Sequence, residues 1–246
     1  MGKTLSQFIG LIDLRMGLVA ILSIASTYVC QRFGILVDMP LELAGIAIVF
    51  PIVFSISQAF QRREAALSAL AEYNACRQAL VLAHRDWPES GSEDHEARAR
   101  RITDALDADV RLMLRDPSPV LERQVRQAFS ELSQSIEGLR EDGRVAATEI
   151  SRVNQYLRLV MVNIEQMRNI SVYRTPRSLR SFTRVFLTIF PIIFGPYFAF
   201  IASASHPAVG YVVALLYATI LVGLDNIQEE LENPYDGIGT DDISLL

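Results

Sequence analysis

Hydrophobic residues gather in four blocks of this chain, and a long polar stretch separates the second block from the third. The four blocks are Met16–Cys30, Leu41–Phe60, Val185–Ser203 and Ala208–Leu224. A helix needs about 20 predominantly apolar residues, at a rise of about 1.5 Å each, to cross the hydrocarbon core of a bilayer. The second and third blocks reach that length, and the shorter two suffice where the bilayer thins or flanking groups snorkel. The pattern therefore predicts four membrane-spanning helices in two hairpins.

Three prolines interrupt these apolar blocks. Pro51 lies in the second block, where it permits a bend, and Pro191 and Pro196 lie in the third. A helix breaker at membrane depth is tolerated where neighbouring protein satisfies the freed backbone groups. We therefore expect a packed assembly and not an isolated four-helix anchor.

The polar stretch between the hairpins reads as a set of helices. Hydrophobic residues recur in it at helical spacing, as at Ile102, Leu106 and Val110, and no alternation of apolar and polar positions lasts for a strand's length. Segments rich in Pro, Gly, Ser and Asp divide it at 87–94 and 116–119. We therefore expect an all-α membrane protein whose soluble part is a bundle of helices.

Composition divides the chain into four segments. Residues 1–60 form an N-terminal hairpin, with spans at about 16–33 and 41–60, and residues 61–184 form a cytoplasmic helical insert. Residues 185–224 form a C-terminal hairpin, and residues 225–246 form an acidic cytoplasmic tail. The tail holds seven acidic residues and no base, whereas arginines cluster in the insert. Opposite charge favours docking of the tail onto those clusters, and a solvated tail is the plainer alternative.

The basic residues predict the orientation of the spans. Lys3 and Arg15 precede the first span, Arg62 and Arg63 follow the second, and no base follows Arg184. Positive charge favours the cytoplasmic side of a membrane. The N-terminus and the insert are therefore expected in the cytoplasm, and four spans return the C-terminus to that side. This topology describes a multi-pass protein of a plasma or inner membrane.

Several classes of function find no support in the sequence. It contains no nucleophile elbow, Walker loop or zinc-protease motif, so we expect no enzyme and no catalytic residue. The two cysteines, Cys30 and Cys76, show neither disulfide nor zinc spacing. The insert carries 20 arginines and 18 acidic residues, a balance that argues against binding of nucleic acid.

Three stretches stand out when the order of features is taken together. They are an apolar span from Pro40 through Phe54 that ends at Gln61-Arg62, the segment Thr175-Pro176-Arg177-Ser178 leading into FLTIFPIIF at 186–194, and EELENPY at 229–235 followed by DDISL at 241–245. These stretches resemble three features of the bestrophin family of pentameric ion channels, bacterial branch. The first resembles the family's second span, the second its P-x-P segment with the L-P-F span, and the third its E-[DN]-P-F-G signature with trailing acids. With the layout of two spans, insert and two spans, the resemblance covers nearly the whole chain.

The resemblance implies a homopentamer around an axial pore in the lipid bilayer. The hydrophobic positions of its neck match Ile46, Phe50 and Phe54, whose spacing of four residues also places them on one face of a helix. Stacked rings of such side chains would gate by dewetting. Glu42 and Gln58 lie on roughly the same face at either end, and a ring of Glu42 would attract cations at the outer mouth. An apolar stripe in a membrane helix equally suits a surface that faces lipid or packs against protein.

The acidic tail raises the question of calcium, which prefers about six to eight oxygen ligands. Asn233, Asp236, Asp241 and Asp242 would contribute to a clasp like that of the animal bestrophins. The sequence Asp241-Asp242-Ile243 is closer to bacterial members without a clasp. We therefore expect no cofactor, with calcium as the alternative.

The expected function is passive conduction of ions, with chloride as the first assignment implied by the resemblance. Conduction of sodium or potassium by the same fold is an alternative, which Glu42 leaves open. The rival class is a non-conducting membrane scaffold whose helical insert binds a partner protein. Reversal potentials in asymmetric salt separate these three cases.

Overall fold

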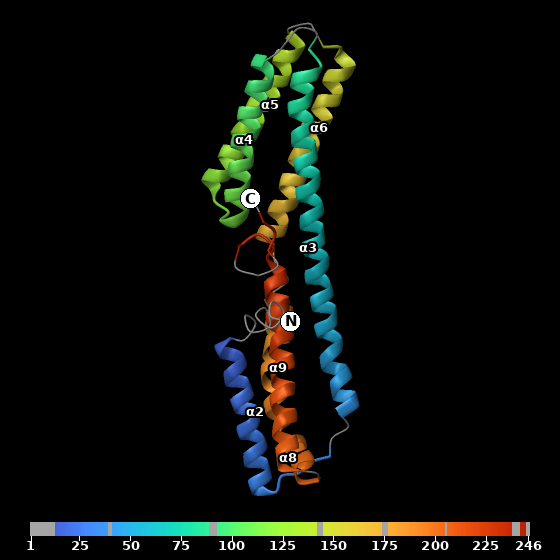
Figure 1. Ribbon diagram of the computed structural model, residues 1–246, viewed down its shortest axis with the longest axis vertical. Coiled ribbons are helices and arrows are strands. Elements are labelled where there is room, and N and C mark those ends of the chain that lie inside the picture. The colour runs from blue at the N-terminus through green and yellow to red at the C-terminus, as the bar shows by residue number, and fades with distance from the viewer. Residues whose placement is uncertain are drawn as a thin grey trace. The chain divides into compact units, whose positions relative to one another are not determined.

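A computed structural model describes residues 13–38, 41–88, 93–141, 145–173, 177–204, 206–237 and 242–244, with the backbone alone at 41–44, 46–48, 93 and 177–179. Every regular element in these ranges is an α-helix, as expected (Figure 1). The chain divides into two compact units. Unit 1 comprises Met1–Gln61 and Thr175–Glu232, and unit 2 comprises Arg62–Arg174 and Asn233–Leu246.

Unit 1 is built from apolar helices. They are α2 (Leu14–Phe33), the first part of α3 (Leu41–Asp86), α7 (Arg177–Ile193), α8 (Gly195–Ala204) and α9 (Pro207–Glu232). Helix α2 packs against α7, α8 and α9, and α9 packs against α7 and α8. The α2–α9 contact buries a cluster that includes Met16, Val19 and Val222. Both ends of α2 are capped: the Asp13 carboxylate accepts a hydrogen bond from the Met16 N–H at 2.7 Å, and Gly34 ends the helix at φ +70°.

Three helices in the described ranges are long and apolar enough to cross a membrane: Leu14–Phe33, Arg180–Ala204 and Pro207–Glu232. They correspond to the first, third and fourth expected spans. The second expected span lies in α3, where several side chains fall outside the described residues, so the four-span arrangement stays a prediction. Helix α9 continues past Leu224 to Glu232, so that the first acidic residues of the expected tail are helical.

The third span breaks between α7 and α8, and α2 supplies the missing hydrogen bonds. Pro196 has no N–H, so the carbonyl of Ile192 lacks its usual helical donor. The Ser26 hydroxyl donates to that carbonyl at 2.7 Å, and the Ser23 hydroxyl donates to the carbonyl of Pro191 at 2.8 Å. The prediction that neighbouring protein satisfies this break is confirmed, but the neighbour is a helix of the same chain, so the break gives no support to an assembly of several copies.

Glycines allow α8 to approach its neighbours closely. A Cβ atom added to Gly210 on α9 would lie 2.4 Å from the carbonyl oxygen of Phe198 and 2.5 Å from Cβ of Ala202. A Cβ atom added to Gly195 on α8 would lie 2.2 Å from Oγ of Ser26. Since real contacts are never this short, the spacing of α8 from α2 and α9 depends on these two glycines.

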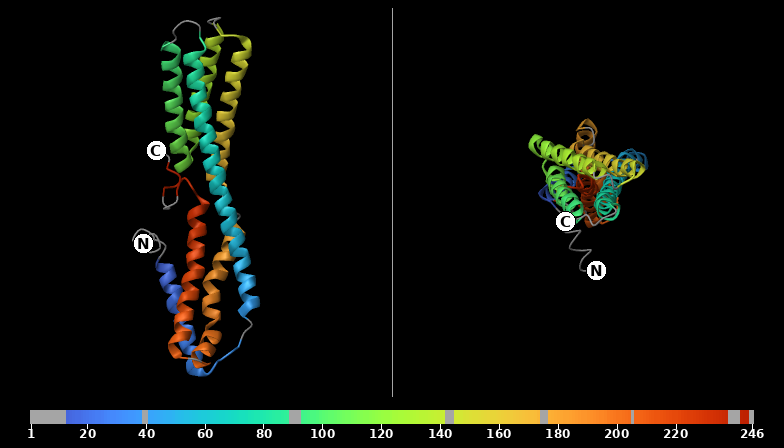
Figure 2. Two further views of the ribbon diagram at one scale, coloured as in Figure 1. Left: turned by 45° about the vertical axis from the view of Figure 1, so that its right-hand side comes forward. Right: turned by 90° about the horizontal axis from the view of Figure 1, so that it is seen from above.

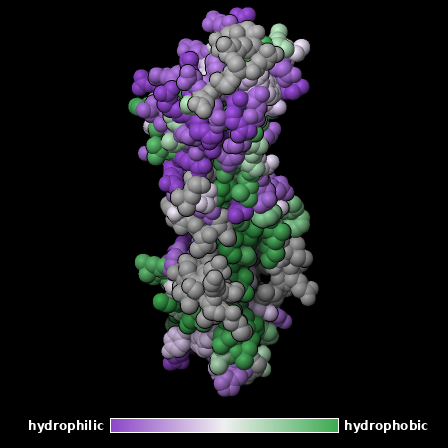
Figure 3. Space-filling view, turned by 45° about the horizontal axis from the view of Figure 1, so that its top comes forward, coloured by the Kyte–Doolittle hydropathy of each residue, from purple (hydrophilic) through white to green (hydrophobic). Residues whose placement is uncertain are grey.

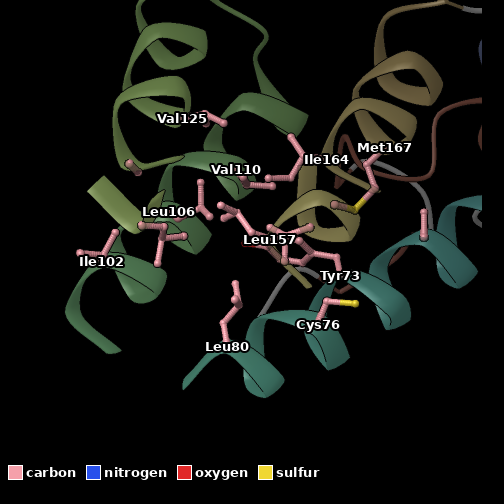
Figure 4. Close-up of a cluster of buried hydrophobic side chains, with 14 of the residues drawn as sticks. Tyr73, Cys76, Leu80, Ile102, Leu106, Val110, Val125, Leu157, Ile164 and Met167 are labelled. Atoms are coloured by element: carbon pink, nitrogen blue, oxygen red, sulfur yellow. The ribbon is translucent and has the colours of Figure 1, made fainter. Parts of the chain in front are cut away.

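Unit 2 is a bundle of helices. It contains α3 from Arg62 onward, α4 (Glu93–Arg115), α5 (Pro119–Glu141) and α6 (Ala147–Val172) (Figure 2). The apolar stripes of these helices meet in one buried cluster, in which Tyr73, Leu106 and Leu157 come from three different helices (Figure 4). Burial of such periodic stripes is what stabilises helices of this length in a bundle.

The described part of the tail packs onto unit 2. Tyr235 is 1% exposed, and its hydroxyl donates to the carbonyl of Ala66 at 3.1 Å. Ile243 is also buried, and its N–H donates to the carbonyl of Pro234 at 2.8 Å. The alternative of a solvated tail is wrong for these residues, because two apolar side chains anchor them in the hydrophobic core of unit 2.

The two units differ in surface character. On the face shown in Figure 3, hydrophilic residues dominate the described surface of unit 2, and hydrophobic residues are widespread over unit 1. The exposed hydrophobic side chains of unit 1 include Leu18 and Ile21 on α2 and Leu216 and Ile220 on α9. Exposed apolar surface of this extent on a helical unit suits contact with lipid.

Candidate functional site

The first part of α3 has a packed face and an exposed face. Ile52 and Ala59 are 1% and 4% exposed, and Ile52 belongs to a buried cluster with Leu187 and other residues of α7, α8 and α9. Phe50 and Phe54 are 62% and 53% exposed. At about 100° per residue these two aromatic side chains point roughly opposite to the packed face. One side of α3 thus fixes the helix in unit 1, and the other side presents two large apolar rings.

The two exposed rings contact one another. The centroids of Phe50 and Phe54 lie 4.7 Å apart with an interplanar angle of 71°, an edge-to-face arrangement. Pro51 lies between them in sequence, and α3 continues through it without a break. Each ring therefore limits the rotamers of the other, which gives this exposed face a defined apolar shape.

The other predicted pore residues are only partly described. Gln58 is exposed, on the side of α3 that carries Phe54. Glu42 and Ile46 belong to α3, but their side chains lie outside the described residues. The structure thus brings three of the five predicted residues to one exposed side of α3, and the neck and mouth assignments stay predictions.

Ion pairs join α2, α7 and α9 at one end of unit 1. Arg15 on α2 pairs with Asp225 on α9, and it donates to Oγ1 of Thr188 on α7 at 2.8 Å. Arg184 on α7 donates to Glu229 at 2.7 Å, and its Nε atom lies 3.8 Å from the carboxylate of Asp225. These charges fix three helices to one another where the apolar stretch of the unit ends.

A further ion pair extends this set. Arg180 on α7 lies 3.3 Å from Glu232, whose side chain is 3% exposed. The spacing of Asp225, Glu229 and Glu232 places all three on one face of α9. The predicted docking of the acidic tail onto arginines of the insert is confirmed for Glu229 and Glu232, which pair with Arg184 and Arg180.

The pairing of Arg15 with Asp225 was not predicted from the sequence, which suggested only a topology marker at Arg15. A signal was nevertheless present. Each is a single charge at the border of an apolar block, on segments expected to reach the same side of the membrane. Charges so placed favour a partner on a neighbouring helix, because burial without one is costly.

Three of the four residues of the expected calcium clasp, Asn233, Asp236 and Asp242, lie in the described part of the tail. The amide nitrogen of Asn233 donates to Asp236 at 2.8 Å, whereas the amide oxygen of Asn233 is buried and has no hydrogen-bond partner among the described residues. Asp242 is partly buried, and Asp241 lies outside the described residues. Within the described ranges, no group of three or more His, Cys, Asp or Glu side chains is placed to hold a metal ion. Because Asp241 lies outside these ranges, the calcium clasp stays a prediction.

Arg62 has a structural partner in unit 2. Its guanidinium donates to the carbonyls of Ile170 and Tyr173, at the C-terminal end of α6. A cation at this end of a helix satisfies free carbonyls and complements the helix dipole. Arg62 thus does more than mark topology, because it ties α3 to the end of α6.

Next to Arg62, a groove of about 690 Å³ opens between α3 and α6. Its lining is mainly apolar, with polar residues along it; the lining residues are Arg62, Ala65, Arg158, Met161, Val162, Glu165, Gln166, Asn169, Ile170 and Tyr173. It is open to solvent and not an enclosed cavity. A groove of this form suits an elongated partner better than an enclosed small molecule.

His84 is buried between α3 and α5. Its Nδ1 lies 2.8 Å from the carbonyl oxygen of Leu80, and its Nε2 lies 3.2 Å from Oγ of Ser135, which is 1% exposed. Burial lowers the pKa of His84, and the nearby charges of His95 and Arg98 lower it further. The Ser135 hydroxyl is out of reach of any substrate, so the pair belongs to the core and not to a catalytic site.

Comparison with known proteins decides the fold. No protein-family model and no curated protein matches this sequence. A substituted form of a bacterial bestrophin homologue from Klebsiella pneumoniae has a TM-score of 0.80 and 19% identity, over 94% of this chain and 92% of that chain. The chain has the bestrophin fold. Another structure of a bacterial bestrophin homologue from Klebsiella pneumoniae has a TM-score of 0.77 and 19% identity, over 94% and 91% of the two chains. A further structure, of a membrane protein, has a TM-score of 0.79 and 18% identity, also over 94% and 91%.

The bestrophin fold agrees with the resemblance seen in the sequence. The described parts of the three short stretches that suggested it lie mainly in α3, in α7 and in the end of α9 with the segment that follows. The fold assignment therefore does not depend on any one of these motifs, because the match extends over 94% of this chain.

Proposed function

We propose that this chain is the subunit of a homopentameric ion channel of the bestrophin type, which conducts ions passively across a lipid bilayer. Helix α3 lines the pore, with a neck at Ile46, Phe50 and Phe54 and with Glu42 and Gln58 at its two ends. The observation that carries this proposal is the exposed aromatic pair on α3, opposite the face that packs into unit 1. The bestrophin fold supports it.

The neck requires several copies of the chain. A single α3 cannot enclose a path, so the exposed face of Phe50 and Phe54 gains a function only where other copies complete a ring. Five copies would stack apolar rings around the axis. A narrow apolar constriction is unfavourable for water and for a hydrated ion, so small changes in its width open or close it.

Chloride is the first assignment for the conducted ion, on the basis of the fold family. A ring of Glu42 at the outer mouth would favour cations instead, because acidic rings concentrate sodium and potassium. Reversal potentials measured with the pentamer in asymmetric salt separate the two. A shift toward the chloride equilibrium potential supports an anion channel, and a shift toward the potassium potential contradicts that assignment.

The neck is tested with the double variant Phe50→Ala/Phe54→Ala in proteoliposomes. Widening and hydrating the constriction should raise basal ion flux several-fold over the unsubstituted channel. The matched control is Phe33→Ala, which removes a phenylalanine that is 75% exposed on α2 and should leave flux unchanged.

Two other outcomes have clear meanings when the oligomer mass in detergent is measured in parallel. Unchanged flux from a correctly assembled Phe50→Ala/Phe54→Ala pentamer contradicts the neck. An assembled pentamer that conducts no ion, with or without these substitutions, contradicts the channel and favours a scaffold that binds a partner through its insert.

A further inference from the structure

One side of α3 is exposed from Phe54 onward into the part of the helix that belongs to unit 2. Helix α3 is a single element from Leu41 to Asp86 (Figure 1). At intervals of seven residues, which is close to two helical turns, this side carries four exposed residues, Phe54, Gln61, Ser68 and Ala75. The α3 stripe, which is the set of exposed positions of α3 from Gln61 to Gln78, therefore continues the face that carries Phe54.

Another side of α3 faces the core of unit 2. Ala66, Tyr73 and Leu80 follow one another at the same spacing of seven residues, and each is 0% exposed. All three belong to the buried cluster of unit 2. Packing therefore holds α3 in one rotational setting, and the α3 stripe cannot turn into the bundle without breaking this core.

The α3 stripe has the composition of a surface that faces water. Its members are all polar or small, and they are Gln61, Glu64, Ser68, Ala71, Glu72, Ala75 and Gln78. The exposed side of α6 differs, because Met161, Val162 and Tyr173 are large apolar side chains that are 44%, 48% and 68% exposed. The α6 surface suits contact with protein, whereas the α3 stripe suits contact with water.

Glu72 gives the α3 stripe a net negative charge. The stripe carries two acids, of which Glu64 pairs with Arg63 at 3.4 Å. Glu72 is exposed and forms no ion pair with any residue that the structure describes. Each copy of the chain therefore offers one uncompensated carboxylate on this side of α3.

The bases near the α3 stripe do not reverse this sign. Arg62 donates to carbonyls of α6, and Arg77 pairs with Asp107 of α4 at 3.3 Å. The groove between α3 and α6 adds one base and one acid, Arg158 and Glu165. The charge that these groups leave on the exposed side of α3 is that of Glu72.

We propose that the α3 stripe continues the ion path beyond the neck and that Glu72 sets the charge selectivity of the channel. The inference rests on the proposed function, because the stripes of several copies must face one axis. The copies then place their Glu72 carboxylates in a ring, and such a ring concentrates cations. Glu72 thereby raises the permeability to sodium and potassium relative to chloride, whichever ion carries more current.

The test replaces Glu72 with glutamine, which removes the charge and keeps a polar side chain of similar size. In proteoliposomes with asymmetric potassium chloride, Glu72→Gln should lower the ratio of potassium to chloride permeability several-fold. The effect should shrink when the salt is raised from about 0.1 M to about 1 M, since the Debye length falls from about 10 Å to about 3 Å. The matched control is Glu131→Gln, which removes an exposed carboxylate from α5 and should leave the ratio unchanged.

A second variant tests whether position 72 lies in the path. Both native cysteines are replaced with alanine, and Glu72→Cys is added. An anionic methanethiosulfonate reagent returns a negative charge to this position and should restore the permeability ratio, whereas a cationic reagent should lower the ratio further. The matched control is Ser133→Cys, an exposed position on α5, where neither reagent should change the ratio.

The outcomes separate this inference from the proposed function when the oligomer mass is measured in parallel. A conducting pentamer whose permeability ratio is the same with and without Glu72→Gln overturns the inference and leaves the channel standing. A lowered ratio, combined with unchanged flux from Phe50→Ala/Phe54→Ala, supports the inference and contradicts the neck. An assembled pentamer that conducts no ion contradicts both the channel and the role of Glu72.

Discussion

Arg15 on α2 and Asp225 on α9 form an ion pair although 210 positions separate them in the chain. The side chains are 22% and 7% exposed, so removing one partner leaves the other with an uncompensated charge. We expect Asp225→Leu to destabilise unit 1 by about 3 kcal/mol. The double variant Arg15→Met/Asp225→Leu should recover most of that loss, since it removes both charges.

Cys30 provides the measurement for this prediction. It is buried on α2, so in a Cys76→Ala background a thiol-reactive dye labels it only when unit 1 opens. The labelling temperature, which is the temperature at which the dye begins to label Cys30 in detergent, should fall for the single variant and rise again for the double variant. If the double variant is as unstable as the single one, an uncompensated charge is not the cause of the destabilisation.

Gly210 should resist substitution far more than Gly17. An added Cβ at Gly210 meets the backbone oxygen of Phe198 at 2.4 Å, whereas nothing lies within 4 Å of one added at Gly17. Gly210→Ala should lower the labelling temperature of Cys30, by forcing α8 and α9 apart, at a cost of about 2 kcal/mol. Gly17→Ala should be neutral or stabilise α2 by up to about 1 kcal/mol, because alanine favours helix. Equal effects of the two substitutions would refute the close approach.

Tyr235 anchors the tail by packing more than by its hydroxyl. Tyr235→Phe removes the hydrogen bond to Ala66 and should cost about 1 kcal/mol. Tyr235→Ala also removes a ring that is 1% exposed and should cost about 3–5 kcal/mol. Chemical unfolding followed by Trp87 fluorescence measures both. If both variants unfold at the same denaturant concentration, the ring is not part of the core of unit 2.

His84 should make unit 2 less stable in acid. Burial lowers the pKa of His84 in the folded state below its ordinary value of about 6.5. The folded state therefore favours the neutral ring, and this contribution is fully present above pH 6.5. Below pH 6.5 the unfolded state binds the proton first, so stability falls with decreasing pH, by at most about 1.4 kcal/mol per pH unit.

The matched variant is His84→Gln, which keeps polar atoms at the site but does not titrate between pH 7.5 and pH 5. Unfolding monitored by Trp87 should show a smaller loss of stability over this range for the variant than for the native chain. The remaining loss in the variant measures the contribution of carboxylates. Identical pH profiles would remove His84 from the explanation.

The spacing of hydrophobic residues and the positions of helix-breaking residues in the sequence predict much of this fold. The helical stripe through Ile102, Leu106 and Val110 marks a buried face of α4, and Pro196 marks a break that other protein must repair. Both follow from local chemistry, since helix geometry and the missing proline N–H depend on a few neighbouring residues. The partners are harder to predict. Nothing local to Ile192 indicates that its carbonyl accepts a hydrogen bond from Ser26.

The candidate site shows the same division. Spacing predicts that Phe50 and Phe54 share a face, and the structure exposes both rings. What covers that face depends on other copies or lipid, which the sequence of one chain does not specify. The tail was expected to follow its net charge; Glu229 and Glu232 do so, whereas Tyr235 and Ile243 pack into the core of unit 2. Two buried apolar side chains outweigh the solvation of the acids beside them.

The hydroxyls of Ser23 and Ser26 also bear on how the chain is made. They lie 168 and 166 positions before the carbonyls that they satisfy, so the ribosome delivers the donors long before the acceptors. When the third span enters the bilayer, the hydroxyl donors on α2 have therefore already been inserted. A chain without α2 would leave the carbonyls of Pro191 and Ile192 without these donors in hydrocarbon. Such a chain should be degraded by quality-control proteases before it assembles.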